Sequence, residues 1–388
     1  MHKTGLFSSL VIVWLTWLCA CSDDPIREVS IQSFAPEAEG PGNEVRIAGM
    51  GFLSDPPDLE LDFNGTAAEV SYLDDTLIVT TVPDGAVSGP INLRVAGRPY
   101  SSLTEFVVLQ GQWTQKADIP FDIGFGAATA FVIDGKAYLG TGGDNGRILD
   151  EFWQYDPATD QWSGIPSIPG GARRFCTSFV INDQAYVGLG VIDNTSDLTP
   201  SFYRYDPGPQ TWTALNDFPG ELPSFKDTYS SFVLSDRGYL LLRKQLWEYN
   251  PDTDLWTEKS AYPGVGNSNH VAISLNAVAY VGLGFTEAYD WWEYSPQNDT
   301  WTSLRTYPGE FTWAVQSFRL GQSVFVVGKQ VWEYDPPLGM WVQRTGHPDG
   351  RRFGSTFSIG DKGYLATGIS NSPSGSPFQK DLWEFVPE

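Results

Sequence analysis

Two pairs of arginines occupy matching places in this chain of 388 residues. Arg173-Arg174 and Arg351-Arg352 are each followed at once by the pattern Phe-x-x-x-Phe, which begins at Phe175 and at Phe353. A guanidinium can form two parallel hydrogen bonds to a carboxylate, and it is matched to other planar anions in the same way. The repeated pattern predicts that the two pairs are equivalent positions in two structural repeats, where they could bind an acidic ligand.

Polar and aromatic residues take the same register elsewhere in the chain. Lys226 precedes a third apolar segment, Asn267 and His270 precede a fourth, and Trp313 precedes a fifth, where its ring could stack on a sugar. The predicted ligand-binding residues are Arg173, Arg174, Lys226, Asn267, His270, Trp313, Arg351 and Arg352. The alternative is that the arginines pair with neighbouring Asp and Glu residues and have a structural role.

Catalysis would need an acid–base group beside these cations. Glu287, Asp290 and Glu310 are the carboxylates that we expect on the same face, together with His270. Solvated loop carboxylates are the alternative interpretation. The sequence contains no metal-ligand spacing, phosphate-binding loop or nucleophile elbow, so no metal or cofactor is expected.

An aromatic repeat predicts the elements that carry these residues. Tyr155 precedes Trp162 by seven residues, and the same interval recurs in four later copies. A sixth copy ends at Phe385 without its closing Trp, while an unpaired Trp113 stands at the start of the region. A period of about 40–50 residues is typical of propeller blades. We therefore expect six blades, with the strand around Trp113 completing the last one and closing the ring.

The first 21 residues read as a leader. The apolar run from Leu6 to Leu18 is short for a membrane span. Leu18-Cys19-Ala20-Cys21 resembles the lipobox of bacterial lipoproteins, which implies that Cys21 is lipidated, and Ser22-Asp23-Asp24 resembles the tether of lipoproteins on the outer face of the outer membrane. The resemblance implies a lipid-anchored protein of the outer membrane facing the cell exterior. An ordinary secretory signal is the alternative.

Two folded regions follow a tether at residues 22–30. Residues 31–109 resemble an IPT/TIG immunoglobulin-like domain in Phe63-Asn64-Gly65 and Val82-Pro83-Asp84-Gly85, which implies a small β-sandwich acting as a spacer, or alternatively as a ligand-binding module. Residues 111–388 resemble kelch repeats, although the kelch diglycine is kept only at Gly142-Gly143. The expected fold is all-β: a six-bladed kelch-like β-propeller preceded by a small Ig-like sandwich.

Composition limits the partners. The formal net charge of −23 disfavours nucleic acid, because phosphate binding depends on Lys and Arg. Beyond the leader only Cys176 remains, so no intramolecular disulfide is available to the body of the chain.

Together these features predict a cell-surface binding lipoprotein that recognises an extracellular acidic glycan or a protein partner. A second hypothesis is a sugar-acid epimerase or mutarotase, because the blade number is similar to that of a kelch-like sialic acid epimerase. A third is a structural partner in an outer-membrane complex. The seven-bladed copper enzyme galactose oxidase is a poorer comparison.

Overall fold

The computed structural model describes residues 28–53, 58–122, 124–144, 146–192, 198–222, 229–285, 288–310, 314–370 and 377–387. These residues form strands and turns, and none of them belongs to a helix long and apolar enough to cross a bilayer. The predictions for Cys21, Lys226, Glu287 and Trp313 lie outside the described residues.

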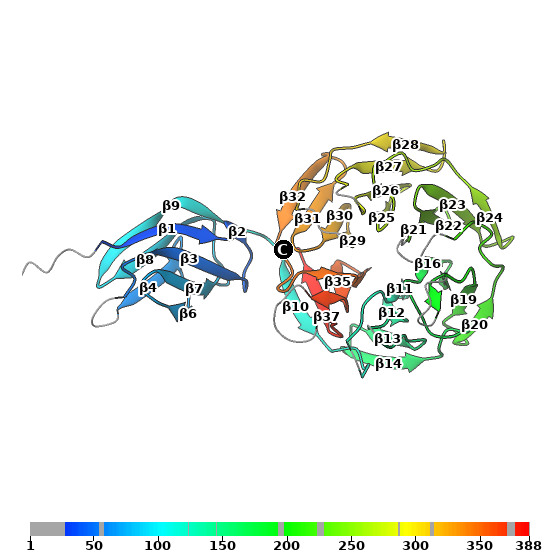
Figure 1. The fold of residues 1–388 in the computed structure, drawn as a ribbon, viewed down its shortest axis with the longest axis horizontal. Helices are drawn as coiled ribbons and strands as arrows, with labels where there is room; N and C mark the ends of the chain where they lie inside the picture. Colours follow the sequence, from blue (N-terminus) through cyan, green and yellow to red (C-terminus); the bar gives the residue numbers. More distant parts are fainter. Residues whose placement is uncertain are drawn as a thin grey trace, which may run out of the picture.

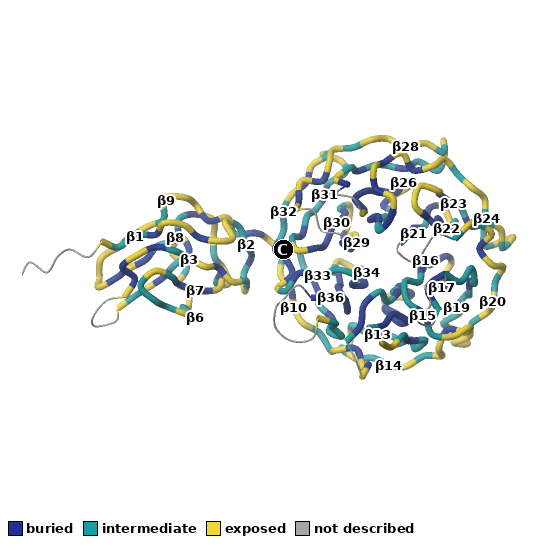
Figure 2. Tube along the Cα trace, in the orientation of Figure 1, coloured by how far each residue is buried: buried dark blue, intermediate teal, exposed yellow. Residues whose placement is uncertain are grey.

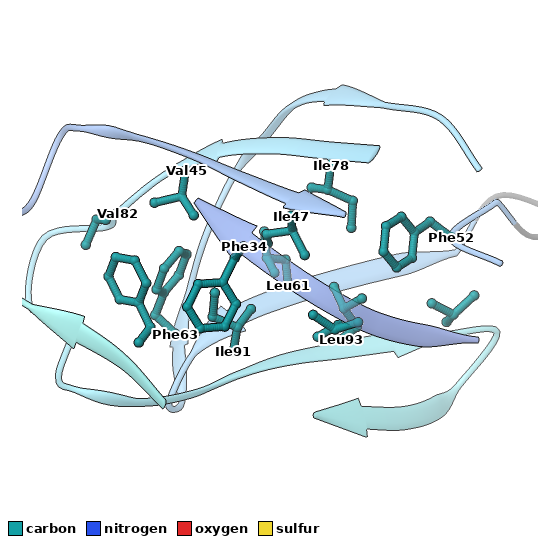
Figure 3. Packing of buried hydrophobic residues seen from close by; sticks show 13 residues of the cluster. Phe34, Val45, Ile47, Phe52, Leu61, Phe63, Ile78, Val82, Ile91 and Leu93 are labelled. Atoms are coloured by element: carbon teal, nitrogen blue, oxygen red, sulfur yellow. The ribbon is translucent and has the colours of Figure 1, made fainter. Parts of the chain in front are cut away.

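Two facing sheets build the N-terminal domain (Figure 1). One has the order β1(Ser30–Ala35), β3(Glu44–Met50), β7(Leu77–Thr81), β6(Val70–Leu73). The other has the order β2(Ala38–Glu39), β9(Arg98–Val108), β8(Gly89–Val95), β4(Leu59–Phe63), β5(Thr66–Ala67). Alternate residues point inward because successive side chains of a strand lie on opposite faces. The inward set includes Ile47, Leu61 and Phe63 (Figure 3). The rings of Phe63 and Phe106 meet edge to face, with centroids 5.0 Å apart.

Six four-stranded antiparallel sheets of the described chain form the blades of a ring (Figure 1). From the centre outward, the blades are β11(Thr129–Ile133), β12(Lys136–Gly140), β13(Phe152–Asp156), β14(Gln161–Ile165); β16(Thr177–Ile181), β17(Gln184–Gly188), β19(Phe202–Asp206), β20(Thr211–Ala214); β21(Tyr229–Leu234), β22(Arg237–Leu242), β23(Gln245–Asn250), β24(Leu255–Glu258); β25(Val271–Leu275), β26(Val278–Gly282), β27(Trp291–Ser295), β28(Thr300–Ser303); β29(Gln316–Leu320), β30(Ser323–Val327), β31(Val331–Asp335), β32(Met340–Arg344); and β34(Ser355–Ile359), β35(Lys362–Ala366), β37(Leu382–Val386), β10(Gln112–Lys116). The predicted fold class is confirmed.

The last blade combines the two ends of the propeller sequence. Strand β10 pairs antiparallel with β37, which places Trp113 opposite Phe385. Their ring centroids are 4.9 Å apart, and Trp113 Nε1 donates a hydrogen bond of 3.2 Å to the carbonyl of Thr345. Pairing these strands completes the sixth blade and closes the ring, so each blade leaves only short sheet edges.

The aromatic repeat packs blade against blade, and its turn aspartates connect neighbouring blades. Tyr155 Oη donates to Asp160 Oδ1 at 2.8 Å, and Asp160 also accepts from the amide of Ala117 in the adjacent blade. The same arrangement joins Tyr249, Asp254 and Asn216, and joins Tyr294, Asp299 and Ser260. These aspartates therefore do more than form turns.

Three blades lack this connection: the last has Phe385 in place of the tyrosine, the fifth has Gly339 in place of the aspartate, and the second has Gln210 there. Gln210 occupies the left-handed position that Asp160 occupies in the first blade, with φ of 55° against 53°. Pro166 replaces Ala117 as the acceptor of the closing Trp indole, and proline has no amide to offer. The buried hydroxyl of Tyr205 then has no hydrogen-bond partner among the described residues. In the second blade the Asp and the amide are therefore absent together, whereas in the fifth blade Gly339 replaces the Asp although Arg305, the acceptor of the Trp341 indole, has an amide.

Candidate functional site

The innermost strands of the blades converge at the middle of the ring (Figure 2), and their residues line a central channel. It contains two adjoining cavities of about 170 and 220 Å³. Along β11 and β16, Phe and Ile side chains pack between the blades, and the residues that alternate with them are half-buried. The small residues at the first such position are Ala130, Ser178, Ser231, Ala272, Ser317 and Thr356.

Hydroxyl groups along the channel wall bond to the neighbouring inner strand. Ser178 Oγ donates to the carbonyl of Ala130 at 2.9 Å, and Ser231 Oγ donates to the carbonyl of Ser178 at 2.8 Å. On the other side of the ring, Thr356 Oγ1 donates to the carbonyl of Ser317 at 2.6 Å. These hydroxyls hold the blades together, so their donor hydrogens are already used.

A ring of left-handed residues surrounds one end of the channel, immediately before the inner strands. This mouth ring consists of Ala127, Phe175, Asn269, Ala314 and Phe353, with φ between 53° and 59°. Its backbone is bonded from blade to blade: Phe175 N donates to Ala127 O at 2.9 Å, and Ala127 N donates to Phe353 O at 3.0 Å. A left-handed residue other than glycine costs about 1 kcal/mol or more, and such residues concentrate at ligand sites.

Aromatic and cationic side chains meet at the mouth ring. The rings of Phe175 and Phe353 contact each other edge to face, with centroids 5.9 Å apart. The guanidinium carbon of Arg174 lies 5.8 Å from the centroid of Phe175. Arg174 and Arg352 are half-buried, and each lies on a short two-stranded ribbon: β15(Arg173–Arg174) pairs with β18(Val191–Ile192), and β33(Arg351–Arg352) with β36(Ile369–Ser370). A guanidinium beside two phenyl rings suits a ligand with an anionic group and an apolar face.

The first arginine of each pair points into the protein, which corrects the prediction that it contacts ligand. Arg173 is 0% exposed. Its guanidinium donates to Ser201 Oγ and to the carbonyl of Pro169, each at 3.0 Å, and lies 5.4 Å from the centroid of the Tyr203 ring. Neighbouring residues of a strand face opposite sides, so when the Arg173 side chain points into the protein, the Arg174 side chain points away from it.

Arg351 is buried in the same way, with carboxylates as partners. It is 1% exposed, donates to both oxygens of Asp381 at 2.5 and 2.6 Å, and donates to Asp349 at 3.0 and 3.1 Å. Burial opposes ionisation of Asp349, but hydrogen bonds from His347 and Arg351 outweigh it and hold the pKa of Asp349 well below its usual value. Arg351 therefore pairs with neighbouring carboxylates and has a structural role, which was the alternative to ligand binding.

The remaining described ligand candidates are divided. Asn267 is exposed beside the mouth. His270 contributes to the cavity wall, but it is buried and its ring packs edge to face on Tyr262 with centroids 4.9 Å apart. Burial lowers the pKa of His270 to about 4, so the ring is neutral at pH 7. His270 is therefore a buried, neutral ring in the cavity wall, and its role as a ligand contact stays a prediction.

Neither described candidate carboxylate reaches the channel. Asp290 Oδ2 accepts hydrogen bonds from Tyr262 Oη at 3.0 Å and Trp292 Nε1 at 2.8 Å, so Asp290 fastens a loop. Glu310 forms an exposed ion pair with Lys329 at 3.1 Å. Over the part of the chain that the structure describes, the two channel cavities have no carboxylate in their walls, and no group of three His, Cys, Asp or Glu residues could hold a metal ion.

Sequence reasoning missed the phenylalanines of the mouth ring and the carboxylates around Arg351. The pattern that begins at Phe175 and Phe353 served only to align the repeats, although it also placed an aromatic ring directly after each arginine pair. Asp349 stands two residues before Arg351, so the sequence could have indicated that ion pair. Asp381 is distant in the sequence, so its pairing with Arg351 could not be predicted.

Comparisons with known proteins identify both domains. Residues 29–108 match the IPT/TIG domain, and residues 126–169 match the Kelch motif. The Kelch-like protein terF of Aspergillus terreus (strain NIH 2624 / FGSC A1156) is 29% identical over 114 residues, which span 26% of this chain and 24% of that protein.

Among solved structures, one titled "Structure of YjhT" superposes with a TM-score of 0.58 and 14% identity, covering 69% of this chain and 96% of that chain. At this identity the likeness shows the fold alone. The chain thus carries an IPT/TIG domain followed by a kelch-type β-propeller.

Proposed function

We propose that the protein is a binding protein and that its ligand is an acidic glycan held at the mouth ring. The observation that carries the proposal is the position of Arg174 beside the Phe175–Phe353 ring pair. A sugar acid presents a planar carboxylate and an apolar ring face, and these two features fit a guanidinium next to phenyl rings. Arg352 occupies the equivalent place in the last blade and would contribute a second cation.

Binding is favoured over catalysis by the chemistry of the wall. An epimerase or mutarotase needs a proton donor or acceptor within hydrogen-bond reach of its substrate. The described walls of the channel offer hydroxyls that already bond to neighbouring strands, and a neutral His270 packed against Tyr262. This is the environment of a recognition surface. A protein partner bearing an acidic segment would use the same cations, and it remains the competing ligand class.

A glycan array of carboxylated, sulfated and neutral glycans tests the proposal. We expect the purified full chain to bind carboxylated glycans and Arg174→Ala to bind them about 10- to 100-fold more weakly, the effect of one lost charge-assisted hydrogen-bond pair. Arg237→Ala is the matched control, because Arg237 pairs with Asp252 in a turn on the opposite face. Equal binding by wild type and Arg174→Ala would contradict the site, and binding of neutral glycans alone would contradict the ligand class.

We also propose that the chain is anchored by lipid at Cys21 and displayed outside the outer membrane, as the lipobox-like Leu18-Cys19-Ala20-Cys21 and the acidic Ser22-Asp23-Asp24 suggest. Several acyl chains on one cysteine would hold a protein stably at a membrane. Cys21→Ser should move the protein from the membrane fraction to the soluble fraction. Retention of this variant in the membrane fraction would contradict the anchor.

A further inference from the structure

We propose that the IPT/TIG domain is fixed to the propeller at Thr345 and that the two domains move as one rigid body, so the domain sets the orientation of the channel instead of acting as a free spacer. We call the contact region, made of Gly40, Asn43, Leu109, Gln110, Thr345 and Gly346, the junction. The inference does not depend on the identity of the ligand.

Thr345 uses its polar atoms to hold the segment that connects the domains. Its amide donates to the carbonyl of Gln110 at 2.9 Å, and its Oγ1 donates to the carbonyl of Leu109 at 3.1 Å. Its carbonyl accepts from Trp113 Nε1 at 3.2 Å. Thr345 is 1% exposed, so these hydrogen bonds are shielded from water and costly to break. The residue that fixes the connecting segment also contacts the strand that closes the ring.

The IPT/TIG domain reaches the same threonine from the other side. Strand β2 pairs in parallel with the end of β9, with Glu39 opposite Val108, and the chain then turns at Gly40. A Cβ atom at Gly40 would lie 2.6 Å from Cβ of Thr345, a distance that real side chains do not show. Asn43 Nδ2 donates to the carbonyl of Gly346 at 3.3 Å. Glycine is therefore required at position 40 by the close approach of the two domains.

The connecting segment is too short and too well bonded to act as a flexible linker. Strand β9 ends at Val108 and β10 begins at Gln112, and the side chain of Gln110 accepts a hydrogen bond of 2.7 Å from Arg344. Flexible linkers are longer and rich in glycine and serine. Figure 1 shows the domain extending sideways from the closing blade, with β1 beginning at the end away from the ring. A rigid junction would therefore hold the ring at a fixed angle to whatever precedes β1.

Gly40→Ala tests the junction in the full chain, with Gly146→Ala as the matched control. Gly146 makes no close contact, and an added Cβ would have only Asp144 within 4.0 Å. In small-angle X-ray scattering, we expect a single arrangement to describe wild type and the control, whereas Gly40→Ala should require several domain orientations. Chymotrypsin cleavage after Leu109 should become about tenfold faster in Gly40→Ala only, because proteolysis follows the population of the open form.

A second variant keeps the test decisive if Gly40→Ala does not fold. Asn43→Ala adds no atom and removes the hydrogen bonds of the amide to Gly346 and to Glu39, which precedes Gly40, so it should raise the cleavage rate in the same direction by a smaller factor. The proposal would be overturned if wild-type scattering required several orientations. It would also be overturned if both junction variants were cleaved at the rate of the control.

Discussion

Replacing Arg351 by Met should strongly destabilise the propeller, while the same change at Arg352 should not. Methionine keeps much of the apolar volume of arginine, so the main loss is the charge. In wild type, the Arg351 guanidinium lies between Asp349 and Asp381 at distances from 2.5 to 3.1 Å. Without it, two largely buried carboxylates lose their cation, while Asp349 keeps its contact with His347 and Asp381 keeps its hydrogen bond from the Trp383 indole.

The size of the expected loss in stability follows from the burial of the ion pair. Removing one partner of a buried ion pair typically costs about 3–5 kcal/mol, because the other charge is left uncompensated. A domain of this size loses about 2–4 °C in Tm for each kcal/mol, so Arg351→Met should melt about 6–20 °C below wild type. Arg352 is half-buried, and its replacement should lower Tm by a few degrees at most.

Calorimetry and urea unfolding of the two variants provide the assay. Adding Asp381→Asn to Arg351→Met should recover part of the lost stability, because it removes one of the two uncompensated charges. The reasoning would be refuted if Arg351→Met melted at the wild-type temperature, or if Arg352→Met were the less stable of the two single variants.

Three further outcomes are expected. In urea unfolding, Gln210→Asp should stabilise the protein by about 1 kcal/mol, because it gives Tyr205 Oη a hydrogen-bond acceptor. Tyr205→Phe should leave the stability unchanged, whereas Tyr249→Phe should cost about 1 kcal/mol. Equal costs for the two Tyr→Phe changes would contradict this. Burial lowers the pKa of His270 from 6.5 to about 4, so as the pH falls this histidine is protonated in the unfolded chain before it is protonated in the folded protein. The free energy of unfolding, at its full value above pH 6.5, should therefore fall by about 3 kcal/mol as the pH drops to 4. A His270→Gln variant that kept the same dependence of stability on pH would contradict the assignment. Truncation after Asp381 removes β37 and should abolish the cooperative melting transition, since β10 then has no partner strand.

The aromatic repeat predicted the blades well because ring packing between the two outer strands of each blade fixes its interval. Tyr155 and Trp162 face each other across β13 and β14, and their ring centroids are 4.9 Å apart, as are those of Tyr249 and Trp256. An interval that must bring two large rings together cannot vary without opening the interior. The register of the strands could therefore be read from the sequence.

The site was harder to predict, because its geometry depends on which way each side chain turns. Two adjacent arginines on a strand must face opposite sides, but the sequence does not say which one faces inward. The mouth ring could not be predicted either, because left-handed backbone usually favours glycine. Here Ala127, Phe175 and Phe353 adopt this conformation because neighbouring blades form hydrogen bonds with their backbone. Both features arise from contacts between residues far apart in the chain.

The most direct test of the account is a calorimetric titration of the best carboxylated glycan from the array into wild type, Arg174→Ala and Arg237→Ala. We expect Kd to rise about 10- to 100-fold for Arg174→Ala and to stay at the wild-type value for Arg237→Ala. The same Kd for all three proteins would contradict a binding site at the mouth ring.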